Sequence, residues 1–278
     1  MKAFIMTDLE GVSGVNGRSD GIGNKIINNE ASCRLLTEEV NATVEGLVEA
    51  GVEEVLVVDG HGGSNSISPE HLHPKAMLQM IGGGIAPVTH IDAGCDVALH
   101  LGTHAMIGVA DGFLNHTFNS HAVAHMELND MPVGEIAIEA LVAAYFGVPT
   151  VLVSGDRAAC REAREFLGRV ETVESKVALS RYSVVNRSPS RVRDELRETA
   201  RNAALNRKSC PIKKIPPPYV LKIRLMCPNL ADTYEMRGIK RLDHQTVLLE
   251  SGDFVDLWAQ RNGWAPGVHG ARFPDLRR

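Results

Sequence analysis

The sequence predicts an α/β protein: a mostly parallel sheet flanked by helices, with a Rossmann-like N-terminal portion and a smaller α+β C-terminal portion. Apolar segments at 2–6 and 55–58 are typical of buried strands, and an amphipathic helical pattern over about 30–50 connects them. Such a unit places two parallel strands in one sheet with a right-handed connection. Two further apolar segments, at 96–101 and 150–154, are also typical of buried strands and would add to the same sheet.

The helix over about 30–50 has the clearest boundaries. Asn29 can cap its amino terminus, and its apolar positions recur mostly at three- and four-residue spacing. Gly51 stands at the C′ position, where glycine commonly ends a helix. We therefore expect an amphipathic crossover helix between two parallel strands.

The remaining elements follow less regular patterns. A helix is predicted over 68–80, although Pro74 is a potential interruption, and a glycine-rich break follows at 82–84. The segment 108–125 has no assignable pattern, and a loosely ordered tail is expected after 261. Helices are predicted at 135–145, 157–167, 188–206 and 254–261, and strands within 170–179, at 220–226 and at 246–250.

The composition is that of a globular protein, and it argues against two classes of partner, nucleic acids and membranes. The 278 residues are 44% hydrophobic and 23% charged, with a formal net charge of −5, so we expect no nucleic-acid partner. No apolar run reaches the roughly 18 residues of a membrane helix, so no membrane partner is expected. The five cysteines include no CxxC pair and no secretory signal is visible, which favours free thiols and a cytoplasmic location.

Metal-binding residue types follow three separate strand-like segments. Asp8 and Glu10 come after the first strand, His61 after the second, and His104 after the strand at 96–101. The carboxyl ends of parallel strands meet at one edge of a sheet, which is where open α/β sheets bind ligands. Asp8 and Glu10 also project to the same side of an extended backbone, and a cation between them would relieve their repulsion.

Each of these residues also has an ordinary structural explanation. Asp8 can cap a turn, His61 can be a loop histidine, His104 can be a turn or core residue, and Glu135 can stabilise a helix amino terminus. Their joint placement at one edge favours a metal site instead. Three carboxylates and two histidines exceed one tetrahedral zinc site but suit two metals that share Asp8, with zinc favoured and manganese or cobalt as alternatives.

The ordered motifs resemble the zinc D-aminopeptidase family of metallopeptidases. The matching segments are Thr7–Gly14, Val58–His61, Leu72–Pro74, Leu101–Ala105, Asn115–Thr117 and Asn129–Glu135. The resemblance implies two zinc ions per subunit on Asp8, Glu10, His61, His104 and Glu135, and a catalytic His116. The residues alone do not separate His116 from His121 or His125.

The resemblance also implies an activity and an assembly. The expected enzyme releases N-terminal D-amino acids, such as D-Ala, from short peptides or amides by means of a dizinc-activated water, with His116 as general acid, general base or nucleophile. The family forms a homo-decamer that encloses its active sites. Residues 1–185 are expected to form the metal-binding catalytic domain, and residues 186–278 a smaller portion that serves oligomerisation or covers the site.

Two other functions compete with this interpretation. One is a haloacid-dehalogenase-like phosphatase with Asp8 as nucleophile, although Glu10 stands where that motif has a second Asp. That alternative leaves His61 and His104 without a role. The other is a metal-binding assembly protein without catalysis.

Overall fold

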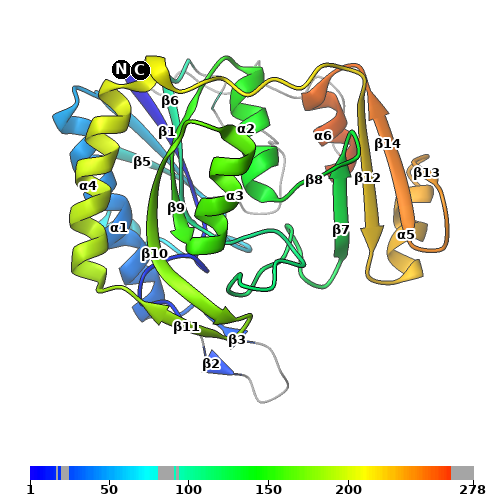
Figure 1. Ribbon diagram of the computed structural model, residues 1–278, viewed down its shortest axis with the longest axis horizontal. Helices are drawn as coiled ribbons and strands as arrows, with labels where there is room; N and C mark the ends of the chain where they lie inside the picture. The colour runs from blue at the N-terminus through cyan, green and yellow to red at the C-terminus, as the bar shows by residue number, and fades with distance from the viewer. Residues whose placement is uncertain (17, 20–24, 81–90, 92–93, 264–278) are drawn as a thin grey trace.

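The computed structural model contains two large sheets, a short two-stranded one, and helices around and between the large sheets (Figure 1). It describes residues 1–16, 18–19, 25–80, 91 and 94–263. The glycine-rich break predicted at 82–84 and the tail predicted after 261, from 264 onward, lie outside these residues. Within the described part of the chain, no helix has both the length and the apolar character needed to cross a membrane.

The larger sheet has seven strands in the order β11-β10-β9-β6-β1-β4-β5. All neighbours pair in parallel except β10 and β11, which form an antiparallel edge. This confirms the predicted mostly parallel sheet. Its strands are β1 (Lys2–Thr7), β4 (Glu54–Asp59), β5 (Ala76–Met80), β6 (Val97–Thr103), β9 (Thr150–Asp156), β10 (Glu171–Ser180) and β11 (Ser183–Asn186).

Helices cover both faces of this sheet (Figure 1). Helices α1 (Glu30–Glu49) and α4 (Pro189–Leu205) pack side by side on one face, and α2 (Glu135–Tyr145) and α3 (Arg157–Leu167) lie on the other. The predicted cap of α1 is confirmed, because the Asn29 side chain accepts a hydrogen bond from the Ser32 amide.

The predicted helix over 68–80 is wrong. The segment contains only a short 3₁₀ helix, Pro69–His71, followed by strand β5. Pro74 lacks the amide hydrogen that a continuing helix needs, and residues 76–80 instead pair in parallel with β4 at the sheet edge.

The second sheet is antiparallel and has the order β13-β14-β12-β7-β8. Two of its strands come from the middle of the chain, so residues 123–132 join the C-terminal residues 219–251. The boundary after residue 185 between a catalytic domain and a smaller C-terminal portion stays a prediction. The elements are β7 (Val123–Leu128), β8 (Met131–Pro132), β12 (Tyr219–Leu225), β13 (Lys240–Arg241) and β14 (Thr246–Ser251), with α5 (Pro228–Glu235) and α6 (Phe254–Asn262) packed beside them. A short hairpin, β2 (Arg18–Ser19) with β3 (Lys25–Ile26), and the 3₁₀ helix Arg207–Ser209 complete the fold.

Successive side chains of β1 contribute to two separate apolar cores. Ala3 and Ile5 pack in the core shared with α1 and α4. Phe4 packs in the other core, together with α2, α6 and the second sheet. Since both faces of the strand are buried, its four central residues, 3–6, are all apolar, as in other parallel sheets.

Candidate metal centre

The carboxyl ends of three adjacent strands supply most of the centre. Strand β1 pairs with β4 on one side and β6 on the other, with Thr7 opposite Asp59 and Leu101. Asp8 and Glu10 follow β1 directly, and His61 and His104 follow the two neighbours. The predicted convergence at one sheet edge is therefore present in the fold.

The loop that carries Asp8 and Glu10 lies directly against the end of β6. The Asp8 amide donates to the Leu101 carbonyl over 2.8 Å, and the Gly11 amide donates to the Gly102 carbonyl over 2.8 Å. A side chain at Gly11 would place its Cβ only 2.0 Å from the Thr103 carbonyl oxygen. Glycine is required here because two backbones approach too closely for any side chain.

The first group of facing side chains joins the ends of β1 and β4. Nδ1 of His61 lies 3.0 Å from Oδ1 of Asp8 and 3.0 Å from Oε2 of Glu10. One candidate ligand atom from each of these three residues falls within 4.8 Å of the others.

The second group shares Asp8 with the first. Nε2 of His104 lies 3.3 Å from Oδ2 of Asp8 and 3.3 Å from Oε1 of Glu135. Glu135 is the first residue of α2, so this group joins the sheet to a helix amino terminus. Asp8 therefore presents one carboxylate oxygen to His61 and the other to His104, which is the geometry of a carboxylate between two cation positions.

His116 lies beside the second group. Its ring stacks on that of His104 with the centroids 4.0 Å apart, and its Nε2 lies 3.9 Å from Oε1 of Glu135. Glu10, His104 and His116 form a third set of atoms within 4.8 Å. By contrast, His125 pairs with Glu127 on β7 and His121 is exposed, so of these three histidines His116 alone lies in the candidate centre.

Both stacked histidines direct the same nitrogen into the centre. Nδ1 of His116 lies 2.9 Å from the Leu114 carbonyl oxygen, and Nδ1 of His104 lies 2.9 Å from the Ala105 carbonyl oxygen. A carbonyl accepts a hydrogen bond, so each Nδ1 carries the proton and donates it. Nε2 of each ring therefore faces the carboxylates, which is the orientation that second contacts usually give to metal-binding histidines.

The carboxylates and imidazoles of the centre shift one another's pKa values strongly. Burial opposes protonation of His61, but its hydrogen bond to Asp8 and its close contact with the Glu10 carboxylate outweigh burial and raise its pKa to about 11. Burial likewise opposes protonation of His104, yet the charges of Glu135 and Asp8 raise its pKa well above the usual value. Burial opposes ionisation of Asp8, but His104 and His61 hold its pKa below the usual range. Positive charge on the two histidines therefore stabilises the carboxylates, as a bound cation would.

The residues present fit a pair of divalent ions. Oε2 of Glu10 is buried and has no hydrogen bond to any described residue, because its 3.0 Å contact with His61 lacks hydrogen-bond geometry. A buried carboxylate oxygen without a partner is costly unless a cation or donor reaches it. Mixed carboxylate and imidazole ligands are those that zinc binds in catalytic sites.

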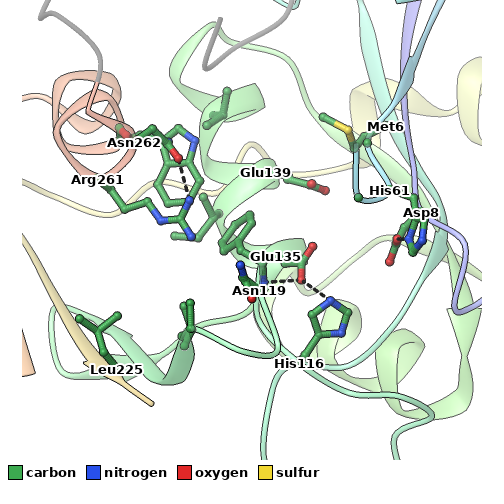
Figure 2. Close-up of a pocket in the computed structure, with 18 of the residues that line it drawn as sticks. Met6, Asp8, His61, His116, Asn119, Glu135, Glu139, Leu225, Arg261 and Asn262 are labelled. Carbon is green, nitrogen blue, oxygen red and sulfur yellow. Dashed lines mark hydrogen bonds and ion pairs between the residues drawn. The ribbon is translucent and has the colours of Figure 1, made fainter. Parts of the chain in front are cut away.

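The centre opens into a cavity of about 640 Å³ between the two sheets. Figure 2 shows Glu135 and His116 in the middle of the view, Asp8 and His61 on one side, and Arg261 on the other. Apolar residues from both sheets line it as well, among them Phe4, Met6, Val123 and Leu225, together with Ile91 from a connecting segment. The volume suits a ligand the size of a short peptide.

The sequence patterns did not indicate several residues around the centre. Glu139 lies one turn after Glu135 on α2 and lines the cavity, with its Oε2 2.8 Å from Nδ1 of the buried His100. Lys176 on β10 is fully buried, which the polar residues before it in the strand did not suggest. No local signal points to Arg261, because Phe118, one of the two aromatic side chains beside it, comes from a distant segment, although Trp258 lies on the same helix.

The fold and the site together define an α/β protein with a candidate metal centre at the carboxyl edge of its parallel sheet. Comparison with known proteins identifies the family to which the chain belongs. The family model for D-aminopeptidase, peptidase family M55, matches residues 1–261. The D-aminopeptidase of Bacillus subtilis (strain 168) is 34% identical over 221 residues, which is 78% of each chain.

A solved structure shows the same similarity in three dimensions. The Zn-dependent D-aminopeptidase DppA from Bacillus subtilis, described as a self-compartmentalizing protease, superposes with a TM-score of 0.85 and 30% identity. The match covers 94% of this chain and 95% of that one. The chain belongs to the D-aminopeptidase family, as its motifs predicted.

Proposed function

We propose that the protein is a zinc-dependent aminopeptidase that removes N-terminal D-amino acids, such as D-Ala, from short peptides or amides. Asp8, Glu10, His61, His104 and Glu135 would hold two zinc ions per subunit, and His116 would transfer the proton. Manganese or cobalt are alternative ions for the same ligands. The zinc requirement and the D-amino acid preference rest on the relatives' described activities.

The observation that carries this proposal is the position of Asp8 between two histidines. Its Oδ1 and Oδ2 lie 3.0 Å and 3.3 Å from ring nitrogens of His61 and His104, which come from different strands. Glu10 adds a carboxylate on the first side and Glu135 adds one on the second. Each side then has a histidine and a carboxylate of its own besides the shared Asp8.

Bound zinc would polarise the scissile carbonyl and lower the pKa of a water molecule towards neutrality. His116 is placed to handle the proton that the reaction moves. Its Nδ1 is occupied by the Leu114 carbonyl and its ring is held against His104, so Nε2 can accept a proton or donate one to the departing amine. The apolar walls of the cavity limit water around this exchange.

Metal analysis combined with a panel of D- and L-aminoacyl dipeptides tests the proposal. We expect two equivalents of zinc and release of D-alanine from D-alanyl-D-alanine, with little or no release from the L,L dipeptide. A folded protein that binds no metal and hydrolyses none of the peptides would contradict it. The same panel decides between an enzyme and a metal-binding assembly protein without turnover.

The phosphatase alternative has less support from the site. Two imidazoles and Glu10 surround Asp8, and a nucleophilic aspartate in a phosphatase has no need of that arrangement. Family membership also favours the peptidase. Phosphatase activity that requires Asp8 but not His104 would reverse this preference.

We also propose that the protein works as a homo-oligomer, a decamer by family resemblance, in the cytoplasm. The similar DppA is described as self-compartmentalizing, and the match covers nearly all of both chains. The five cysteines form no disulfide, which is compatible with a reducing compartment. Tyr234 and Trp258 from the C-terminal portion line the cavity, which supports a site-covering role for that portion. Light scattering coupled to size exclusion would give the subunit number.

A further inference from the structure

The cavity has a cationic end as well as a metal-binding side. Arg261, near the carboxyl end of α6, lines the same cavity as Asp8 and Glu135. Figure 2 shows Glu135 between Arg261 on one side and Asp8 on the other. A ligand that extends from the metal centre through the cavity can therefore meet this guanidinium.

The guanidinium of Arg261 is only partly used by the protein. Nη1 donates to Oδ1 of Asn262 over 2.7 Å, but Nε is buried and makes no hydrogen bond to any described residue. No described carboxylate forms an ion pair with Arg261, whereas Arg161 and Arg241 pair with acidic side chains. A buried donor without an acceptor costs free energy until one arrives.

The side chains around Arg261 fix the direction in which its remaining donors point. The guanidinium carbon lies 4.8 Å from the ring centroid of Phe118 and 4.9 Å from that of Trp258. Asn262, which occupies Nη1, is itself held because its Nδ2 donates to the Trp258 carbonyl over 2.9 Å. The edge formed by Nε and Nη2 has no acceptor among the described residues, and its two donors match the two oxygens of a carboxylate.

The electrostatic environment also favours an anionic ligand at this position. Burial lowers the pKa of Arg261 from its usual value, and nearby Arg237 adds repulsion, while Glu135 acts in the opposite direction. The guanidinium nevertheless stays charged at neutral pH. A buried charge without a counter-ion is unfavourable, so an anion that enters the cavity gains from meeting it.

We propose that Arg261 binds the C-terminal carboxylate of the peptide substrate, so that the cavity favours short peptides with a free carboxyl terminus over the corresponding amides. This inference rests on the proposed aminopeptidase function. The substrate then has its amino-terminal residue at the metal centre and its opposite charged end at Arg261. An acidic side chain of the peptide is the other source of a carboxylate, and the experiment separates the two.

Equilibrium binding to the zinc-loaded enzyme tests the subsite without turnover. The probes are reduced-amide analogues of D-alanyl-D-alanine, in which a CH₂ group replaces the scissile carbonyl, with a free carboxyl terminus or a C-terminal amide. A third probe, the analogue of D-alanyl-D-glutamate with an amidated α-carboxyl, carries only a side-chain carboxylate. Calorimetric titration gives the dissociation constant of each probe for wild type, Arg261→Met and Arg261→Lys.

We expect the wild type to bind the free acid about 10- to 100-fold more tightly than the amide. Arg261→Met should remove that preference, and Arg261→Lys should keep part of it because the charge remains without the planar pair of donors. Arg241→Met is the matched control, since this arginine lies in the same portion and already pairs with Asp232. The control should keep the full preference, and thermal unfolding checks that each variant is folded.

Equal affinity of the wild type for acid and amide would overturn the proposal, as would a full preference in Arg261→Met. Stronger Arg261-dependent binding of the side-chain carboxylate than of the C-terminal one would overturn the assigned source. Parallel assays of D-alanine release keep the two proposals separate. Release without an acid preference contradicts only the subsite, whereas an Arg261-dependent preference without release contradicts only the aminopeptidase function.

Discussion

The ammonium group of Lys176 donates a hydrogen bond to the backbone carbonyl of Glu10 over 2.7 Å. The same nitrogen donates to the Val15 carbonyl over 2.6 Å, and the Lys176 side chain is fully buried on β10. Ser175 adds hydrogen bonds to the Gly11 and Gly155 carbonyls. Strand β10 thus supports the loop that carries Asp8 and Glu10, and it does so through the backbone of that loop and not through the side chains of the candidate ligands.

Replacement of Lys176 by methionine keeps most of the side-chain volume but removes both donors. Two buried carbonyls then lose their partner, so we expect the free energy of unfolding to fall by about 2–4 kcal/mol and the zinc affinity to decrease. Denaturant unfolding measures the first effect and zinc titration the second. Lys222→Met is the control, because Lys222 makes surface ion pairs and its loss should change stability little. Equal unfolding midpoints for the two variants would contradict the role given to Lys176.

Loss of His116 should affect turnover far more than metal binding. We expect His116→Gln to retain two zinc ions while kcat for D-alanyl-D-alanine falls by about 10²–10⁴-fold, since a proton-transfer group is lost. Metal analysis and steady-state kinetics on the same preparation measure both effects. His125→Gln, which removes a histidine paired with Glu127, should behave as wild type. If His116→Gln loses one zinc ion, the histidine is a ligand in the third group with Glu10 and His104 instead.

Glu39 should make the protein less stable as the pH rises from about 4.5 to 7. Burial raises the pKa of this carboxyl to about 7, despite the hydrogen bond from Ser13 and the charges of Lys176 and Arg193. The folded state then binds more protons than the unfolded state within this window, so stability is lost as the pH increases. The loss reaches up to about 3 kcal/mol, at about 1.4 kcal/mol per pKa unit.

Glu39→Gln removes this titration and keeps an acceptor for the Ser13 amide. The difference in unfolding free energy between variant and wild type should therefore grow in favour of the variant between pH 4.5 and 7. Denaturant unfolding at a series of pH values measures it. Glu45→Gln, an exposed carboxyl on the same helix, serves as the control. A constant difference between Glu39→Gln and wild type across the window would show that Glu39 is ionised in the folded state.

Local sequence patterns predict those elements whose ends are marked by a capping residue or a terminal glycine. Helix α1 begins at the Asn29 cap and Gly51, just past its end, has a positive φ of 84°, as its sequence predicted. The prediction of a helix over 68–80 is wrong because pairing with β4 decides the conformation of residues 76–80. The spacing of apolar residues within the segment gives no sign of that pairing. Strand β7 was missed for the same reason, since its register is set by β12 from far along the chain, with Leu128 opposite Leu221.

The candidate ligands could be predicted from the sequence because a single rule of sheet topology places them close together. Parallel strands end at the same edge, so Asp8, His61 and His104 needed only the strand assignments to be placed together. Lys176 and Arg261 follow no such rule. Their roles depend on contacts between distant segments, such as the Glu10 carbonyl with β10 and Phe118 with α6.

The position of Asp8 between two cation sites is the central claim, and metal content per subunit tests it most directly. We predict two zinc ions for the wild type, one for His61→Ala, and none for Asp8→Ala, with Asp8→Asn as a check that the fold survives loss of the charge. Plasma mass spectrometry on dialysed, folded protein gives these numbers. Two zinc ions at full occupancy in Asp8→Ala would contradict the assignment of Asp8 as the shared ligand.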